Sequence, residues 1–180
     1  MLKLTIEFAY AVCSLLCAAA GAIFDISSRR IPNFVTLPAI CLGLLLHLTL
    51  GGWRQLGSAA AAGLICGSIF LLFYLAGGMG AGDVKLMAAV GCISGLSLIA
   101  PLLISTSLAG GGMALGLALY HRRFKETMLN ICALAAHHRS EGLVPHPQLN
   151  VGDARAMRLP YAIAIATGSA LSLLLLFVQR

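Results

Sequence analysis

Long apolar stretches, interrupted by short polar ones, dominate the chain. Five stretches contain no Asp, Glu, Lys or Arg, and together they cover 124 of the 180 residues. A helix needs about 20 apolar residues to cross the hydrocarbon core of a bilayer. Runs that are continuously apolar, rather than alternating, favour helices over the strands of a membrane β-barrel. The pattern predicts an all-α polytopic membrane protein with a single domain over residues 1–180. The five stretches are residues 8–24, 31–53, 55–82, 86–120 and 159–179.

Turn-forming residues divide these stretches into about six expected transmembrane helices. The run 86–120 would reach roughly 50 Å as one helix, which is too long for one crossing, so we expect a break near residues 94–97. A short turn at 51–54 and a glycine-rich loop at 77–82 separate other spans. The fourth span is then short and must be sheltered by its neighbours. The expected spans are residues 4–24, 34–50, 56–76, 84–94, 98–120 and 160–178.

The only sizeable polar segment covers about residues 121–158. Its first part carries apolar side chains at helical spacing with charged residues between them, which predicts an amphipathic helix lying on the membrane surface. Two prolines and a glycine then favour irregular structure. The apolar positions are Phe124, Met128, Ile131, Cys132 and Ala135, and the breakers are Pro145, Pro147 and Gly152.

Composition agrees with a membrane protein and adds an orientation. Charged residues make up only 10% of the chain, against roughly 25% in an ordinary soluble domain. The net charge of +6 is explained by topology rather than by nucleic-acid binding, because Lys and Arg collect in cytoplasmic loops. With six spans, nine basic residues fall on one side and three on the other. The nine, expected to be cytoplasmic, are Arg29, Arg30, Lys85, Arg122, Arg123, Lys125, Arg139, Arg155 and Arg158.

Cysteines and histidines give little support for a metal site. None of the six cysteines stands in a CxxC pair, and five lie in uncharged runs, so we expect them to be buried as small hydrophobic residues. Four of the five histidines fall in the polar segment, where solvated side chains on a basic loop are the favoured interpretation. These histidines are His121, His137, His138 and His146.

Two acidic residues, Asp25 and Asp83, stand at span ends beside polar motifs. Ionisable groups at membrane depth are costly and are functional candidates. Two carboxylates brought together can share a proton, activate water and protonate a leaving amine. Each also has a simpler explanation: Asp83 could cap a helix N-terminus, and Asp25 could pair with Arg29 four residues on. A cap alone does not require the glycines that precede Asp83.

The motifs around these two residues resemble those of the type IV prepilin peptidases. Residues 80–83 form a GxGD motif that continues into Lys85 and Leu86, and Asp25 is followed after five residues by Ile-Pro-Asn at 31–33. Residues 159–164 resemble the proline-containing start of the family's last span. The resemblance covers almost the whole chain, and the shorter members that act on Flp-type (Tad) pilins are similar in size.

The resemblance implies a GxGD aspartic protease fold with Asp25 and Asp83 as the two catalytic aspartates. Gly80 and Gly82 match the motif glycines, and Lys85 matches the lysine that follows them. This lysine either orients Asp83 or another oxygen, or it helps to set the orientation of the chain in the membrane. It implies no cofactor and no metal. The remaining supporting residues are Arg29, Arg30, Pro32 and Asn33.

The implied activity is endopeptidase removal of the short basic leader from Flp-type prepilins, at the cytoplasmic face of the bacterial inner membrane. Expected partners are the prepilin and membrane lipids, with no nucleic acid. Two departures from the family matter. Ser27 stands where many members have Arg, and the chain has no cytoplasmic region with paired CxxC motifs. We therefore expect a peptidase without methyltransferase activity, S-adenosylmethionine or zinc.

Three alternatives stay open from the residues alone. A presenilin-like GxGD protease would cut inside a transmembrane helix, although its first aspartate usually sits deeper in a helix than Asp25. A small transporter would require polar groups near the midplane of several spans. A non-catalytic scaffold for pilus assembly would not need an intact GxGD motif.

Overall fold

The computed structural model describes residues 2–142, 144 and 160–178. Every regular element in this part of the chain is a helix, and four of the helices are long and apolar enough to cross a membrane. The prediction of an all-α polytopic membrane protein is confirmed. The helices are α1 (Leu2–Ser28), α2 (Asn33–Leu75), α3 (Ala81–Tyr120), α4 (Phe124–Glu141) and α5 (Tyr161–Val178).

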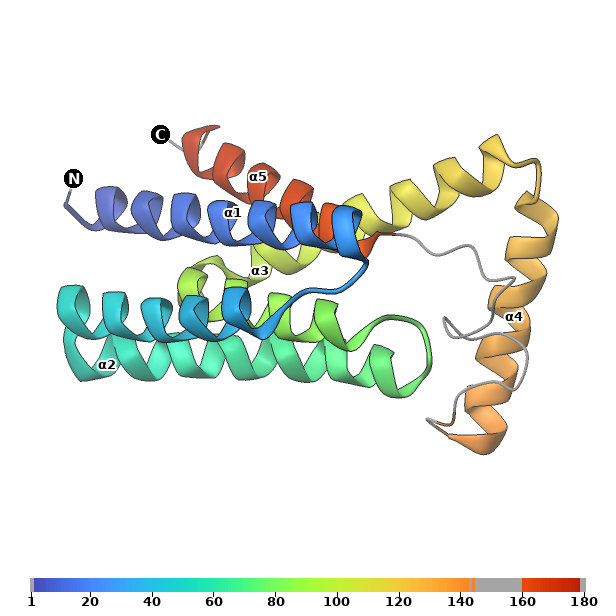
Figure 1. Ribbon diagram of the computed structural model, residues 1–180, viewed down its shortest axis with the longest axis horizontal. Helices are drawn as coiled ribbons and strands as arrows, with labels where there is room; N and C mark the ends of the chain where they lie inside the picture. Colours follow the sequence, from blue (N-terminus) through green and yellow to red (C-terminus); the bar gives the residue numbers. More distant parts are fainter. Residues whose placement is uncertain (1, 143, 145–159, 179–180) are drawn as a thin grey trace.

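Two of the apolar helices, α2 and α3, reverse direction along their length (Figure 1). The backbone is non-helical at Gly52 and at Gly95, each with φ of 69°. Glycine is suited to both positions because it lacks the Cβ that penalises a positive φ. With α2 and α3 each folded into two halves, the four helices make six passes, as the turns in the sequence predict.

Side chains of α2 satisfy the backbone groups that the reversal of α3 leaves without helical partners. The buried His47 ring lies 3.0 Å from the carbonyl oxygen of Ile93 through Nε2. The backbone N–H of Leu96 donates to Oγ of Ser58 at 3.1 Å. Broken helices are tolerated at membrane depth only when such partners exist. His47 therefore has a structural role that the sequence did not suggest.

The short first half of α3 forms the centre of the bundle, where α1, α2 and α5 pack around it. Leu86, Met87 and Val90 are fully buried, and the burial continues to Gly95. The expectation that a short fourth span is sheltered by its neighbours is confirmed. The side chains packed around it include Ala18 and Ala22 of α1, Cys66 and Phe70 of α2, and Ala162 and Ile165 of α5.

Two cysteines fill notches that glycines leave in the contact between α2 and α3. A Cβ on Gly91 would lie 2.9 Å from Sγ of Cys66, and a Cβ on Gly63 would collide with Sγ of Cys92. These two thiols are buried, as expected for small hydrophobic residues. The expectation is wrong for Cys41 and Cys132, which are exposed, and Cys13 and Cys17 are half-buried. Cys41 lies on the outer side of a membrane helix, where an apolar residue faces lipid rather than protein.

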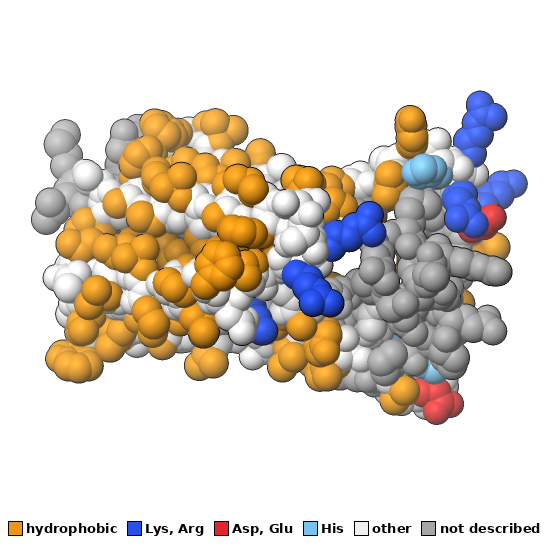
Figure 2. Space-filling view, in the orientation of Figure 1, with side chains coloured by type: hydrophobic (Ala, Val, Ile, Leu, Met, Phe, Trp, Pro, Cys, Tyr) orange, Lys and Arg blue, Asp and Glu red, His pale blue; other side chains and the backbone are white. Residues whose placement is uncertain are grey.

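Helix α4 stands across the end of the bundle, roughly at right angles to the other helices (Figure 1). It confirms the predicted helix at the start of the polar segment, and none of its residues is buried. The expected irregular structure at residues 145–158 lies outside the described residues. On the face in Figure 2, Lys and Arg side chains gather toward this end, and hydrophobic side chains cover most of the flank.

Candidate active site

Asp25 lies in the last turn of α1, at the end of the bundle where α4 stands. We expected the first span to end near residue 24, but α1 continues to Ser28. Arg29 then adopts a left-handed conformation with φ of 51°, and its N–H donates to the backbone oxygen of Asp25 at 2.8 Å. This is a common way to end a helix. Pro32 favours an extended Ile31 before it, so the chain leaves the helical conformation there.

Asp83 lies in the first turn of α3, at the same end of the bundle. The backbone N–H of Gly80 donates to Oδ2 of Asp83 at 3.3 Å, and the N–H of Asp83 donates to the oxygen of Gly80 at 3.2 Å. The N-cap residue is therefore Gly80 and not Asp83, as the simpler explanation had it; the Asp83 side chain helps to cap the helix from its third position. A carboxylate has two oxygens and several lone pairs, so one capping bond leaves capacity for chemistry.

The two carboxylates are brought together by the packing of α1 and α3. They are half-buried and close enough to interact electrostatically, although 58 positions separate them in the sequence. Asp25 also interacts with the Arg29 side chain and with the backbone N–H of Ala162, in the first turn of α5. Because α5 packs against both α1 and α3, three helices converge on the pair.

The glycines of the GxGD motif differ in what they do. A Cβ on Gly82 would lie 3.2 Å from Cβ of Ile31, so Gly82 lets the start of α3 pack tightly on the turn after α1. Glycine permits this close approach because it has no side chain. A Cβ on Gly80 would make only an ordinary contact, 3.4 Å from Oδ2 of Asp83. The close approach thus depends on Gly82 rather than on Gly80.

Lys85 joins the two motifs that the sequence identified. Its Nζ donates to Oδ1 of Asn33 at 3.0 Å, across 52 positions of sequence. Of the roles proposed for Lys85, orienting another oxygen is the one the geometry supports. The bond connects the first turn of α3, which carries Asp83, to the first residue of α2. The turn that follows Asp25 is therefore tied to the helix that carries Asp83.

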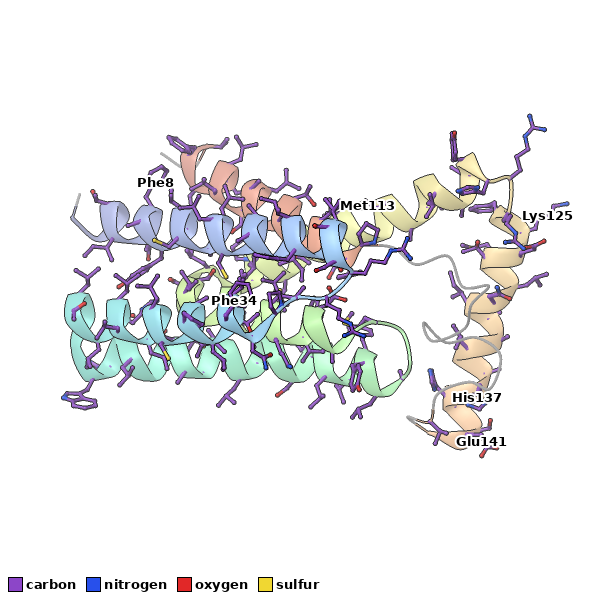
Figure 3. The ribbon with its side chains drawn as sticks, viewed as in Figure 1. Phe8, Phe34, Met113, Lys125, His137 and Glu141 are labelled. Carbon is purple, nitrogen blue, oxygen red and sulfur yellow. The ribbon has the colours of Figure 1, made fainter. Side chains whose placement is uncertain are left out.

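The remaining supporting residues also lie at this end. Arg29 and Arg30 are exposed, and Pro32 immediately precedes α2. Figure 3 shows Phe34 at the start of α2, and its ring meets that of Phe24 edge-on with centroids 5.3 Å apart. His137 and Glu141 lie on α4, separate from the helices that carry the two aspartates (Figure 3).

We expect the bond between Lys85 and Asn33 to tune cleavage modestly. For the leader removal that the resemblance implies, replacing Lys85 with Met should lower the rate about threefold to tenfold, because one exposed hydrogen bond contributes little free energy. Asn33→Ala should have a similar effect, and the double variant should be no worse than either single one. Lys125→Met, on α4, is the control. Effects that multiply in the double variant would show that Lys85 acts independently of Asn33.

Sequence reasoning did not place the first turn of α5 in the site. Tyr161 interacts electrostatically with Asp83, and the neighbouring Ala162 offers its N–H to Asp25. The signal available was Pro160, which marks the start of the last span on the side where both aspartates lie.

The arrangement supplies a pair of carboxylates and backbone donors in a half-buried setting. Two close carboxylates share protons, so that one serves as base while the other serves as acid. Within the described part of the chain, no group of three His, Cys, Asp or Glu side chains is placed to hold a metal ion. The chemistry that this pair itself supports is hydrolysis with an activated water.

Comparison with known proteins identifies the family of the chain. The model of the type IV leader peptidase family matches residues 10–115, which include both aspartates. The chain belongs to the type IV leader peptidase family. No solved structure matches it significantly.

Curated proteins that are similar to the chain include bacterial prepilin leader peptidase/N-methyltransferases. The match to that of Aeromonas hydrophila has 40% identity over 102 residues, which are 53% of this chain and 35% of the relative. The Neisseria gonorrhoeae protein is 39% identical over 94 residues, 48% of this chain and 32% of its own length. The Burkholderia pseudomallei protein is 34% identical over 112 residues, which are 56% of this chain and 35% of the relative. The family member described here thus matches about a third of each relative.

Proposed function

We propose that the protein is a membrane-embedded aspartic endopeptidase that removes the leader peptide of type IV prepilins. The observation that carries the proposal is that Asp25 and Asp83 lie at one end of a membrane bundle, close enough to interact electrostatically. Membership of the type IV leader peptidase family supports the same substrate class. The alternative functions of transporter and scaffold have no comparable support.

In the proposed reaction, one ionised carboxylate accepts a proton from a water molecule, whose oxygen attacks the carbonyl carbon of the scissile amide. The other carboxyl group, protonated at the start, donates its proton to the leaving nitrogen as the C–N bond breaks. The products are a free leader carboxylate and a new amine at the pilin N-terminus. The two residues exchange protonation states during each turnover, and solvent restores them.

We propose that this site faces the cytoplasm at the bacterial inner membrane. The two aspartates lie at the end where the exposed Arg29, Arg30 and Lys85 are found, and α4 brings further basic side chains to it (Figure 2). Lys and Arg collect on the cytoplasmic side of membrane proteins. A prepilin inserted with its basic leader in the cytoplasm would present the leader junction at the depth of the pair.

We also propose that α4 lies on the lipid surface and that the substrate is of the Flp type. The orientation of α4 across the bundle end fits a helix in the interface plane. On α4, the apolar side chains of Phe124, Met128 and Ile131 are exposed and do not pack into the protein. The Flp type rests on the resemblance to the shorter family members. Absence of methyl transfer to the new N-terminus also stays a prediction.

Reconstitution with purified prepilins tests the activity. The protein in vesicles should shorten a Flp-type prepilin to a product whose new N-terminus, read by mass spectrometry, follows the leader. A longer type IV prepilin in a parallel reaction tests substrate class, and its cleavage in place of the Flp-type substrate would contradict the Flp assignment. Products cut within the transmembrane helix would indicate a presenilin-like protease. A folded protein that cleaves neither prepilin would contradict the proposal.

A further inference from the structure

The loop between α1 and α2 buries one apolar side chain. Arg29 and Arg30 are exposed, but Ile31, which follows them, is only 8% exposed and belongs to the main buried cluster of the bundle. Most connecting segments run over the surface of a protein, where their side chains contact solvent. The burial of Ile31 shows that this loop packs onto the bundle as well as joining two of its helices.

Ile31 packs on the backbone of α3 directly before Asp83. A Cβ on Gly82 would lie 3.2 Å from Cβ, 3.3 Å from Cγ1 and 3.5 Å from Cδ1 of Ile31. The isoleucine side chain thus lies along the bare backbone of Gly82, with no side chain between them. Because Gly82 and Asp83 share a rigid peptide bond, the position of Ile31 limits where the backbone of Asp83 can lie.

Backbone contacts fix the other end of the same loop to the turn of α1 that carries Asp25. The N–H of Arg29 donates to the backbone oxygen of Asp25 at 2.8 Å, with Arg29 in the left-handed conformation. The hydroxyl of Ser28 donates to the backbone oxygen of Arg30 at 3.1 Å. A non-glycine residue in the left-handed conformation costs free energy and persists only where its surroundings hold it. The short path from Asp25 to Ile31 is therefore held at both ends.

A second contact fixes the rotation of the loop on α3. Asn33, just after Ile31, accepts the hydrogen bond from Lys85, just after Gly82. One contact point would let the loop pivot on α3, and two contact points prevent this. The hydrogen bond is exposed, so water can replace it at little cost in free energy. The buried packing of Ile31 on Gly82 is the less replaceable of the two contacts.

We propose that Ile31 is a positioning residue for leader cleavage, whose side chain seats the loop on Gly82 and so sets the placement of the two aspartates relative to each other. The inference rests on the proposed function. Ile31 has no group that could take part in the chemistry, so its effect on the reaction comes through the two turns that it joins. A misplacement of about 1 Å can lower an enzymatic rate by roughly 10²-fold, and a close-packed interior transmits such a shift.

Ile31→Ala tests the proposal because it removes the atoms beyond Cβ that lie on Gly82. The loop can then shift on α3, so we expect kcat for prepilin cleavage to fall about tenfold and KM to stay within about twofold. Ile31→Val loses only Cδ1 and keeps the branched shape that suits extended backbone, so it should retain at least about half of the wild-type kcat. The unfolding midpoint of Ile31→Ala should fall by only about 2–4 °C, because the loop can close over a void at the bundle end.

Ile99→Ala is the matched control for a shortened isoleucine. Ile99 is half-buried just after the reversal of α3 and packs against the same buried cluster as Ile31. It lies beyond the opposite end of the first half of α3 from Asp83. Ile99→Ala should lower the unfolding midpoint to a similar extent and leave kcat unchanged.

Gly82→Ala tests the same contact from α3. The added methyl group would lie 3.2 Å from Cβ of Ile31, so the loop must give by a few tenths of an ångström, and we expect kcat to fall here too. Combining Gly82→Ala with Ile31→Ala should give a kcat at least as high as that of Gly82→Ala alone, because the shortened side chain makes room for the new methyl group. Gly67→Ala is the control, since its added Cβ would lie equally close, 3.2 Å, to Cβ of Ala88, farther along α3. It should keep the wild-type kcat.

The outcomes separate this inference from the proposed function. If the wild type cleaves and Ile31→Ala cleaves equally fast, Ile31 has no positioning role and the proposed function stands. Equal losses of kcat in Ile31→Ala and Ile99→Ala would show that Ile31 is only a packing residue, and would also overturn the inference. Losses that multiply when Gly82→Ala and Ile31→Ala are combined would overturn it as well, because the two residues would then act separately. A folded wild type without cleavage would remove the proposed function, and this inference with it.

Discussion

Replacing either Asp25 or Asp83 with asparagine is expected to reduce leader cleavage by at least about 10³-fold. Asparagine has nearly the same shape but can neither accept a proton from water nor donate one to the leaving amine. General acid and general base steps each contribute roughly 10²–10⁴-fold. Because the two carboxyl groups act on one reaction as a pair, the double variant should be no slower than either single variant.

The measurement is the initial rate of prepilin cleavage in vesicles, with the unfolding midpoint of each variant measured in detergent. Glu126→Gln is the matched control, because it removes an exposed carboxylate of α4 that pairs with the preceding Arg123 at 2.8 Å. It should cleave at the wild-type rate. If Asp25→Asn or Asp83→Asn does the same, the paired-carboxylate mechanism is wrong, whatever the family membership.

Replacing Gly168 with alanine is expected to give the largest loss of stability among the single substitutions considered. Gly168 lies in α5 against Thr106 of α3, and an added Cβ would be 2.6 Å from both the backbone N and Cα of Thr106. Backbone atoms cannot rotate out of the way, so α5 and α3 must separate. Overpacking of this kind costs about 1–3 kcal/mol. Since the first turn of α5 engages both aspartates, cleavage should fall as well.

The control for this substitution is Gly112→Ala. Gly112 lies in α3 with nothing near its would-be Cβ, so alanine there should leave stability unchanged or raise it through higher helix propensity. The midpoint of thermal unfolding in detergent and the rate of prepilin cleavage should both be lower for Gly168→Ala than for Gly112→Ala. A Gly168→Ala protein with wild-type stability would show that α5 does not pack on α3 at this distance.

The spans were predictable because crossing a bilayer imposes length and apolarity on local sequence. Both reversals were predictable from local sequence: the run of 35 uncharged residues at 86–120 is too long for one simple pass, and a short glycine-containing turn at 51–54 separates the two spans of α2. Span ends were predicted less well. The first helix continues past Asp25 to Ser28 and ends where Arg29 takes a left-handed conformation. Composition does not indicate where such a conformation occurs.

The candidate aspartates were identified from motif and family resemblance, and the supporting contacts were not. The hydrogen bond between Lys85 and Asn33 joins residues 52 positions apart, and local patterns do not encode such pairings. Tyr161 is the clearest case, because as one aromatic residue at the start of an apolar span it has the sequence context of any interfacial tyrosine.

By itself, the sequence determined that this protein is a membrane helix bundle, where its chain turns, and that two acidic residues lie at the ends of spans on one side. These properties follow from local composition and from the cost of charge in lipid. Only the tertiary structure decided that Asp25 and Asp83 come within electrostatic range of each other, that Gly82 and Gly168 let helices approach closely, and that the first turn of α5 interacts with both carboxylates. Those features depend on packing between segments far apart in the chain, where the shape of each surface selects its partner.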